Sequence, residues 1–250
     1  MGEHMPDPAN YKQEVARSFG GDWASKYREL DEQSLSPGDA GEHYCRALGQ
    51  ISAAFDRQID VLDVGCGTGR YFHCLKGVRR LVGIDISAQM LQQARDPIRR
   101  EQIDIPTIEL ICGDALSVEL PLAGFDLIYS IGVLGEYSPL DKPTLRRLRD
   151  LLAPRGVLFL TAVDSSSRVS VPETGAPSFA RRLVRKSFPL LPHAFRRFLN
   201  RKLSPFYVSR AEVKAAFLAA GFTDVTLTEF VHTTGWLGTH WDCLVENENR

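Results

Sequence analysis

The chain has 250 residues, of which 44% are hydrophobic and 24% are charged, and its formal net charge at pH 7 is −1. This length suits one α/β domain with an appendage, and the balance is typical of a soluble globular protein. No run of about 18 apolar residues occurs, which excludes a transmembrane helix. We expect no signal peptide, and the sequence has no internal repeats or low-complexity segments.

Cysteine usage indicates a reducing compartment. The five cysteines are an odd number, and no two of them form a Cys-x-x-Cys pair. We therefore expect reduced, mostly buried thiols and a cytoplasmic protein. Because metal-ligand spacing is absent and the six histidines are scattered, the sequence predicts no metal site. The cysteines are Cys45, Cys66, Cys74, Cys112 and Cys243.

Residues 61–69 are the most informative segment of the chain. An apolar strand ends at Val64 and runs directly into a turn with Gly65, Gly67 and Gly69 at every second position. Glycines allow backbone dihedrals that other residues avoid and let a ligand approach the main chain. A helix that follows such a turn begins with free N–H groups, which attract a carboxylate or phosphate. The turn alone also fits an ordinary βα connection with extra glycines.

Two neighbouring residues distinguish this turn from a dinucleotide-binding turn. Asp63 stands two residues before the first glycine, and Arg70 occupies the place of the third glycine in a GxGxxG motif. A leading acid followed by GxGxG resembles the first motif of class I S-adenosylmethionine-dependent methyltransferases. The resemblance covers roughly residues 15–165 and 205–247 and implies a Rossmann-like, doubly wound mixed sheet of seven strands, the last inserted antiparallel. It also implies that S-adenosylmethionine is the cofactor. The helix N–H groups would then bind its carboxylate, and Asp63 would bind its ammonium group or stabilise the loop.

The N-terminal part, residues 10–55, is predicted to be helical, with a break near residues 34–38. Aromatic residues recur at helical spacing between Phe19 and Tyr27. Such a stripe usually packs on a core. The resemblance implies a second interpretation, in which an aromatic helix closes over the cofactor through Tyr27, with Tyr11 as a less favoured alternative.

Two further acids follow predicted strands. The strand over residues 80–85 ends at Asp85, where a carboxylate can accept hydrogen bonds from both ribose hydroxyls of an adenosine. After the strand over residues 108–112, the resemblance implies that Asp114 accepts the adenine amino protons and that the Ala115 N–H binds a ring nitrogen. Two apolar residues, Ile86 and Met90, would form a wall for adenine or belong to the core.

After a predicted strand over residues 125–130, Gly135 and Glu136 stand where many small-molecule methyltransferases have paired histidines. A histidine-based mechanism at this position is therefore not expected. The other predicted elements are helices over residues 68–77, 88–100, 141–152 and 211–220, a strand over 157–163, and an antiparallel pair over 222–230 and 241–246.

Residues 164–204 depart from the alternating pattern. Between Glu173 and Glu212 there are nine Lys or Arg and no acid. Since the whole chain has a net charge of −1, the residues outside this segment have a net charge of −10. Apolar residues at helical spacing predict two short amphipathic basic helices here. We expect a lid whose cations hold an anionic acceptor; a membrane contact and a solvated surface remain alternatives. Nucleic acid is not expected, because the acidic remainder would repel a polyanion.

These observations divide the chain into an N-terminal helical cap (1–55), a cofactor-binding methyltransferase domain (56–163 and 205–250) and a basic helical insert (164–204). The residues that the resemblance assigns to the cofactor are Asp63, Gly65, Cys66, Gly67, Gly69, Asp85, Ile86, Met90, Asp114, Ala115, Ser130 and Tyr27.

The predicted function is methyl transfer from S-adenosylmethionine to O or N of a small, anionic molecule. The protein would mainly align the reactants and exclude water, and it needs a general base only for a protonated nucleophile. A methyltransferase for lipid head groups at a membrane surface and a non-catalytic cofactor-binding protein remain alternatives, whereas Arg70 argues against a nicotinamide oxidoreductase. The sequence does not set the oligomeric state. Candidates for the base are His232, His240, Glu136 and His193.

Overall fold

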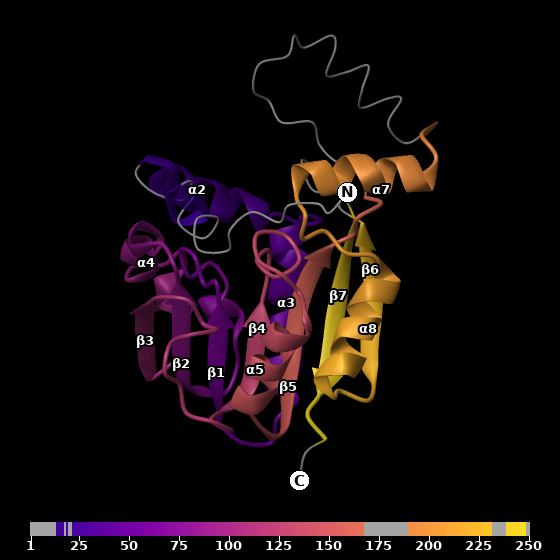
Figure 1. The fold of residues 1–250 in the computed structure, drawn as a ribbon. Helices are drawn as coiled ribbons and strands as arrows, with labels where there is room; N and C mark the ends of the chain where they lie inside the picture. Colours follow the sequence, from indigo (N-terminus) through magenta and orange to yellow (C-terminus); the bar gives the residue numbers. More distant parts are fainter. Residues whose placement is uncertain (1–13, 18, 20–21, 168–189, 232–238, 249–250) are drawn as a thin grey trace.

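The computed structural model describes residues 14–17, 19, 22–167, 190–231 and 239–248. Its centre is one seven-stranded sheet in the order β3-β2-β1-β4-β5-β7-β6 (Figure 1). The strands are β1 (Ile59–Val64), β2 (Val78–Asp85), β3 (Thr107–Cys112), β4 (Phe125–Ser130), β5 (Leu152–Val163), β6 (Val225–Val231) and β7 (Thr239–Glu246).

Strands β1 to β5 pair in parallel, and β7 lies antiparallel between β5 and β6. The predicted seven-stranded, doubly wound sheet with its last strand inserted antiparallel is thus confirmed. The order of strands reverses between β1 and β4, because the chain runs from β1 outward to β3 and then returns. At such a switch point two loops diverge and leave a crevice at the carboxyl ends of the strands.

Helices cover both faces of the sheet (Figure 1). On one face, Tyr44 and Leu48 of α3 pack with Val61, Leu81 and neighbouring apolar residues. The opposite face is covered by α5 and α8, whose apolar sides form a second cluster with β4 and β5. The helices are α2 (Asp22–Ser34), α3 (Ala40–Ala53), α4 (Ala88–Ala94), α5 (Lys142–Leu151), α7 (His193–Leu203) and α8 (Arg210–Ala220), with 3₁₀ turns η1 (Phe72–Cys74) and η2 (Arg100–Gln102).

The predicted helix over residues 68–77 is wrong, because only the short turn η1 forms there. The chain is extended again at Leu75, the C-cap residue of η1, and β2 begins at Val78. Helix α3 occupies the sheet face beside this segment, where Leu48 packs with the fully buried Phe72. The predicted helix over 88–100 is also shorter, since α4 ends at Ala94.

The prediction of reduced cysteines is wrong for two of the five, Cys45 and Cys74. Cys45 of α3 and Cys74 of η1 form a disulfide, with their Cα atoms 5.2 Å apart. Cys112 lies on the edge strand β3 and is exposed, while Cys66 and Cys243 are buried free thiols. Cys45 and Cys74 are 29 positions apart in the sequence, and only the packing of α3 on η1 brings them together.

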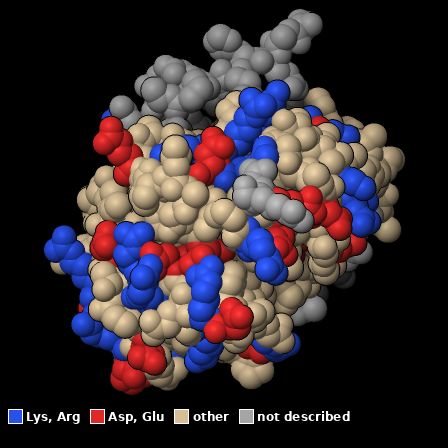
Figure 2. Space-filling model, turned by 90° about the horizontal axis from the view of Figure 1, so that it is seen from below, with Lys and Arg blue, Asp and Glu red and all other residues tan. Residues whose placement is uncertain are grey.

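The two ends of the strands differ in what covers them. Helices α2 and α7 lie across the carboxyl ends, at the top of Figure 1. The opposite end carries interspersed Lys, Arg, Asp and Glu rather than a field of one sign (Figure 2). Two of the ion pairs join Arg57 to Asp126 and Arg79 to Asp60. No helix among the described residues is long and apolar enough to span a membrane.

Candidate cofactor pocket

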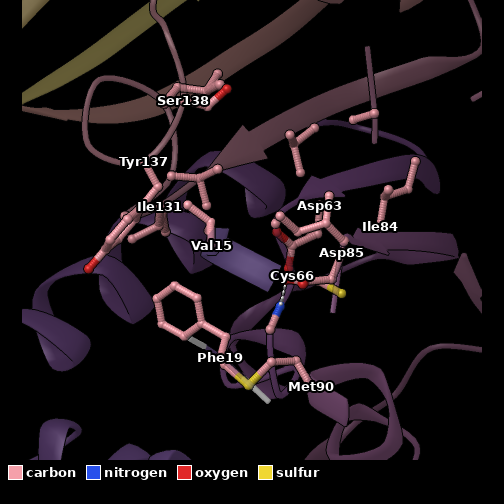
Figure 3. Close-up of a pocket in the computed structure, with 18 of the residues that line it drawn as sticks. Val15, Phe19, Asp63, Cys66, Ile84, Asp85, Met90, Ile131, Tyr137 and Ser138 are labelled. Atoms are coloured by element: carbon pink, nitrogen blue, oxygen red, sulfur yellow. Dashed lines mark hydrogen bonds between the residues drawn. The ribbon is translucent and has the colours of Figure 1, made fainter. Parts of the chain in front are cut away.

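A pocket lies at the carboxyl ends of β1, β2 and β4, at the switch point of the sheet (Figure 3). One half is polar, with Asp63 and Asp85 close together in Figure 3. The other half is aromatic and aliphatic, because Phe19 and Tyr137 face these acids across the cavity. The lining residues are Val15, Phe19, Tyr27, Asp63–Thr68, Arg70, Tyr71, Ile84–Ile86, Met90, Gly113–Leu116, Ile131–Leu134, Tyr137, Ser138 and Leu148.

The glycine turn supplies the floor of the pocket. Gly65 has a φ of 79° and Gly67 a φ of 55°, values that side chains disfavour. A Cβ on Gly65 would lie 2.3 Å from Val133 Cγ2, so this glycine is needed for packing. A Cβ on Gly67 would meet only Met90 Cε, at 3.6 Å, so it would project into space that a ligand can use.

Asp85 joins the turn to the next strand. Its carboxylate accepts hydrogen bonds from the backbone N–H groups of Gly67 (2.9 Å) and Ser87 (2.8 Å), one on each oxygen. Each oxygen keeps lone pairs for a second donor. Burial raises the pKa of this carboxyl, and the two N–H groups oppose that shift. The geometry fits the pair of vicinal hydroxyls that an adenosine ribose presents.

Asp63 is a buried carboxyl at the end of β1. Burial raises its pKa to about 8, and the neighbouring Tyr129 hydroxyl and the Arg70 charge work in the opposite direction. The neighbouring charge of Asp85 raises the pKa further. Asp63 is therefore protonated at neutral pH until a cation arrives, and a ligand ammonium is such a cation.

The adenine end of the site is formed by two loops. Asp114 follows β3, and its Oδ1 accepts a hydrogen bond from the Leu116 N–H at 3.0 Å. Ala115 is buried beside it, and Ile86 and Met90 line the same cavity. A carboxylate next to apolar walls provides an acceptor and stacking surfaces for a purine.

Aromatic side chains close the other half. The Phe19 ring meets Tyr27 at 6.1 Å and Tyr137 at 5.3 Å between centroids, in both cases edge to face. This arrangement joins the N-terminal segment to the loop after β4. Edge-to-face aromatic pairs are favourable beyond their buried area, so they form a stable wall. Of the two interpretations of this aromatic stripe, the structure supports a cover over the pocket, with Tyr27 in its lining.

Helix α2 is fixed to the glycine turn by a buried ion pair. The Asp31 carboxylate lies 3.2 Å from Arg70 Nε and also accepts a hydrogen bond from Thr68 Oγ1. The Arg70 side chain is 22% exposed and lines the pocket. Arg70 also donates to Ser34 Oγ at 3.2 Å. The residue that replaces a third glycine thus connects the cover to the floor.

The four candidates for a general base have different surroundings. His232 lies outside the described residues. His193 is exposed at the start of α7, and His240 is buried in β7; neither lines the described pocket. Glu136 is buried, and its carboxylate shares a hydrogen bond with the Tyr137 hydroxyl. Burial raises the pKa of Glu136 to about 7, although this hydrogen bond lowers it.

Ten of the twelve residues assigned to the cofactor line this one pocket. Gly69 and Ser130 do not: a Cβ on Gly69 would clash with Phe72, and the Ser130 hydroxyl donates to the Val64 carbonyl. Sequence reasoning missed Val15, Arg70 and Tyr137 as lining residues. The position of Arg70 next to the glycines was a usable signal, whereas Val15 and Tyr137 reach the pocket only through the folded loops.

Known proteins share this domain. A family model described as a methyltransferase domain matches residues 61–156. The tRNA U34 carboxymethyltransferase of Shewanella amazonensis is 40% identical over 103 residues, which cover 40% of this chain and 30% of that protein. The chain thus matches only about a third of the length of these curated relatives.

Two solved structures show the same fold. Magnesium protoporphyrin IX methyltransferase from Synechocystis, with bound S-adenosylmethionine, has a TM-score of 0.62 at 13% identity and covers 98% of this chain and 99% of its own. A phosphoethanolamine N-methyltransferase from Haemonchus contortus has a TM-score of 0.61 at 13% identity and covers 96% of this chain and 60% of its own. Residues 61–156 thus match a methyltransferase domain, and the whole chain shares the fold of these methyltransferases, with the strand order and the acid-lined glycine turn described above.

Proposed function

We propose that the protein transfers a methyl group from S-adenosylmethionine to an oxygen or nitrogen of a small molecule held under the aromatic cover. The observation that carries this proposal is the division of the pocket into a half with Asp63, Asp85 and Asp114 and a half with Phe19 and Tyr137. The first half fits the cofactor, since Gly67 leaves open space and Asp85 keeps acceptors free. The second half is where an acceptor would meet the methyl group.

The cofactor supplies a methyl group on a sulfonium sulfur, which leaves as a neutral thioether. The chain's own residues have two tasks. Asp85, Asp114 and the glycine turn hold one reactant, and the aromatic wall holds the other in line and excludes water.

A protonated nucleophile also needs a proton acceptor. Tyr137 lines the pocket and Glu136 hydrogen-bonds to its hydroxyl, so this pair provides a route for a proton out of the site. A carboxyl with a pKa of about 7 is matched to proton transfer near neutral pH. We assign the base role to Glu136, acting through Tyr137.

The wall predicts an acceptor with an apolar or aromatic body. Arg70 is the one cation in the described lining, so a carboxylate of the acceptor or of the cofactor would bind there. In α7, Arg197 and Arg201 both pair with Glu212 of α8 instead. Within the described lining, recognition of an anionic acceptor therefore rests on Arg70, and the basic residues Arg181, Arg182, Arg185 and Lys186 of the predicted lid lie outside the described residues.

A lipid head group is the second candidate acceptor. Phe195 and Phe198 of α7 are 47% and 51% exposed and stack with their centroids 6.3 Å apart, beside Arg196. Exposed aromatics next to cations are suited to an anionic membrane surface.

A panel of acceptors tests these proposals. The full chain is incubated with S-adenosylmethionine and one class of acceptor at a time. The classes are aromatic hydroxy acids and amines, vesicles containing phosphatidylethanolamine and an anionic lipid, and tRNA. The last is included because the name of the curated relatives gives tRNA as their substrate. Formation of S-adenosylhomocysteine is measured by mass spectrometry. We expect turnover with the small molecules; turnover with vesicles alone would favour the lipid proposal, and turnover with tRNA alone would contradict both.

A further inference from the structure

A histidine, His73, lies beside the disulfide Cys45–Cys74. His73 Nε2 lies 3.7 Å from Cys45 Sγ and 3.5 Å from Cys74 Sγ. These three side chains form the one group of metal-binding type that the described residues contain. None of them lines the cofactor pocket, so the site is separate from the one described above.

The distances match those between ligands of a tetrahedral metal ion. With Zn–S bonds of 2.3 Å and Zn–N bonds of about 2.0–2.1 Å, a nitrogen and a sulfur on one zinc lie about 3.6 Å apart. Both nitrogen-to-sulfur distances have this value already. Only the two sulfurs, which are bonded to each other here, would have to separate, to about 3.8 Å by the same geometry.

Burial and charge also favour a divalent cation. Cys74 is 4% and His73 6% exposed, while Cys45 is half-buried, so one side of the cluster is accessible from solvent. Two thiolates and a neutral imidazole around a dication have no net charge, which keeps the cost of burying the group small. Thiolate and imidazole ligands select Zn²⁺ over the hard cations Mg²⁺ and Ca²⁺.

We propose that Cys45, His73 and Cys74 bind a thiophilic divalent cation, Zn²⁺ above all, when the disulfide is reduced. A dithiol reductant supplies two electrons and two protons, is itself oxidised to a disulfide, and leaves two free thiols. Zn²⁺ then displaces the two thiol protons and takes the His73 Nε2 lone pair, with a fourth position left for water. Disulfide and metal site are thus two alternative states of one cluster.

The cluster is connected to the cofactor pocket through η1. Phe72 stands next to His73, and its ring would lie 2.7 Å from a Cβ on Gly69, so η1 packs directly against the glycine turn. In both states the cluster anchors η1 to α3. In the reduced, metal-free state this anchor is missing.

Metal titration of the full chain tests the proposal. The protein is reduced with a water-soluble phosphine, desalted without oxygen and titrated with Co²⁺ as a spectroscopic probe, then with Zn²⁺ as competitor. We expect one Co²⁺ per chain with thiolate charge-transfer bands, its displacement by Zn²⁺, and no such bands for the oxidised chain. The bound metal should also raise the melting temperature of the reduced protein.

Two variants complete the test. Cys45→Ser replaces the half-buried ligand. Its Co²⁺ affinity should fall by more than the about 10- to 100-fold that follows from removing a residue that only hydrogen-bonds to a ligand. Cys112→Ser removes an exposed thiol outside the cluster and should bind Co²⁺ like the unmodified chain. The proposal would be overturned if Cys45→Ser bound Co²⁺ as tightly as the unmodified chain. It would also be overturned if the reduced unmodified chain showed no thiolate charge-transfer bands with Co²⁺.

Discussion

Asp85 is the residue that contributes most directly to the proposed cofactor site. Both of its oxygens accept backbone N–H groups and keep lone pairs toward the pocket. Asp85→Ala should weaken binding of S-adenosylhomocysteine by about 1.5–3 kcal/mol, the range for lost hydrogen bonds to a charged group. Isothermal titration calorimetry measures this difference. Asp96→Ala, which removes an exposed carboxylate beyond the end of α4 that pairs with Arg28, is the control and should bind normally; equal losses in both variants would contradict the role of Asp85.

Binding of the cofactor should release the proton of the Asp63 carboxyl. Burial holds the pKa of this carboxyl at about 8, so at pH 7 it is protonated in the empty protein. A ligand ammonium stabilises the carboxylate, so binding should release close to one proton at pH 7. The affinity should rise by about tenfold between pH 6 and pH 7. Calorimetry in two buffers of different ionisation enthalpy measures the released proton, which should vanish in Asp63→Asn; a heat independent of the buffer would show that Asp63 stays neutral.

The same pKa fixes how Asp63 affects stability. A carboxyl that ionises near 4 in the unfolded chain and near 8 in the folded chain favours folding fully at low pH, and this contribution is lost as the pH rises toward 8. Asp63→Asn keeps a neutral side chain at all pH values. The variant should therefore gain stability relative to the unmodified protein as the pH is raised from 5 to 8.

Glu136 should determine the pH dependence of catalysis. With a pKa of about 7, its carboxylate accepts a proton only above neutral pH. Glu136→Gln should lower turnover by about 10²–10⁴-fold for an acceptor with a protonated nucleophile and remove the limb of the pH profile near 7. His240→Gln is the comparison, because His240 is buried outside the pocket lining. A profile that keeps its limb in Glu136→Gln would show that alignment alone carries the reaction.

At the scale of elements, α2 matters because it is fixed in place over the pocket. The pair of Asp31 with Arg70 is buried, with side chains 1% and 22% exposed. Asp31→Ala would remove the carboxylate that balances the charge of Arg70 and leave its hydrogen bond to Ser34, which should cost about 3–5 kcal/mol of unfolding free energy. Arg99→Ala breaks the exposed pair with Glu32 and should cost at most about 1 kcal/mol. Urea unfolding of both variants measures the contrast; similar costs would mean that α2 is held by surface contacts alone.

The elements also show what sequence patterns can predict. The strands of the sheet and the capping box of α8, in which Ser209 and Glu212 exchange hydrogen bonds, are encoded locally and were predictable. The length of the segment after the glycine turn was not, because α3 rather than local propensity decides that only η1 forms there. Tertiary packing overrode the local pattern.

For the whole molecule, the sequence predicted one side of the pocket better than the other. Asp63, Asp85 and Asp114 end successive strands, and parallel strands bring their carboxyl ends together. The aromatic wall depends on a loop and on the N-terminal segment, whose contacts have no periodicity to read. The disulfide was hidden for the same reason, since it joins elements 29 residues apart.

Calorimetric titration of the full chain tests whether this pocket binds S-adenosylmethionine. We expect a single site for S-adenosylmethionine and for S-adenosylhomocysteine, with micromolar affinity, corresponding to about −8 kcal/mol. We expect no binding of NAD⁺ at the same concentrations, because Arg70 and its ion pair with Asp31 occupy the region after the glycine turn. Absence of heat with both sulfur ligands, or binding of NAD⁺ as tight as theirs, would show that the pocket is not a site for S-adenosylmethionine.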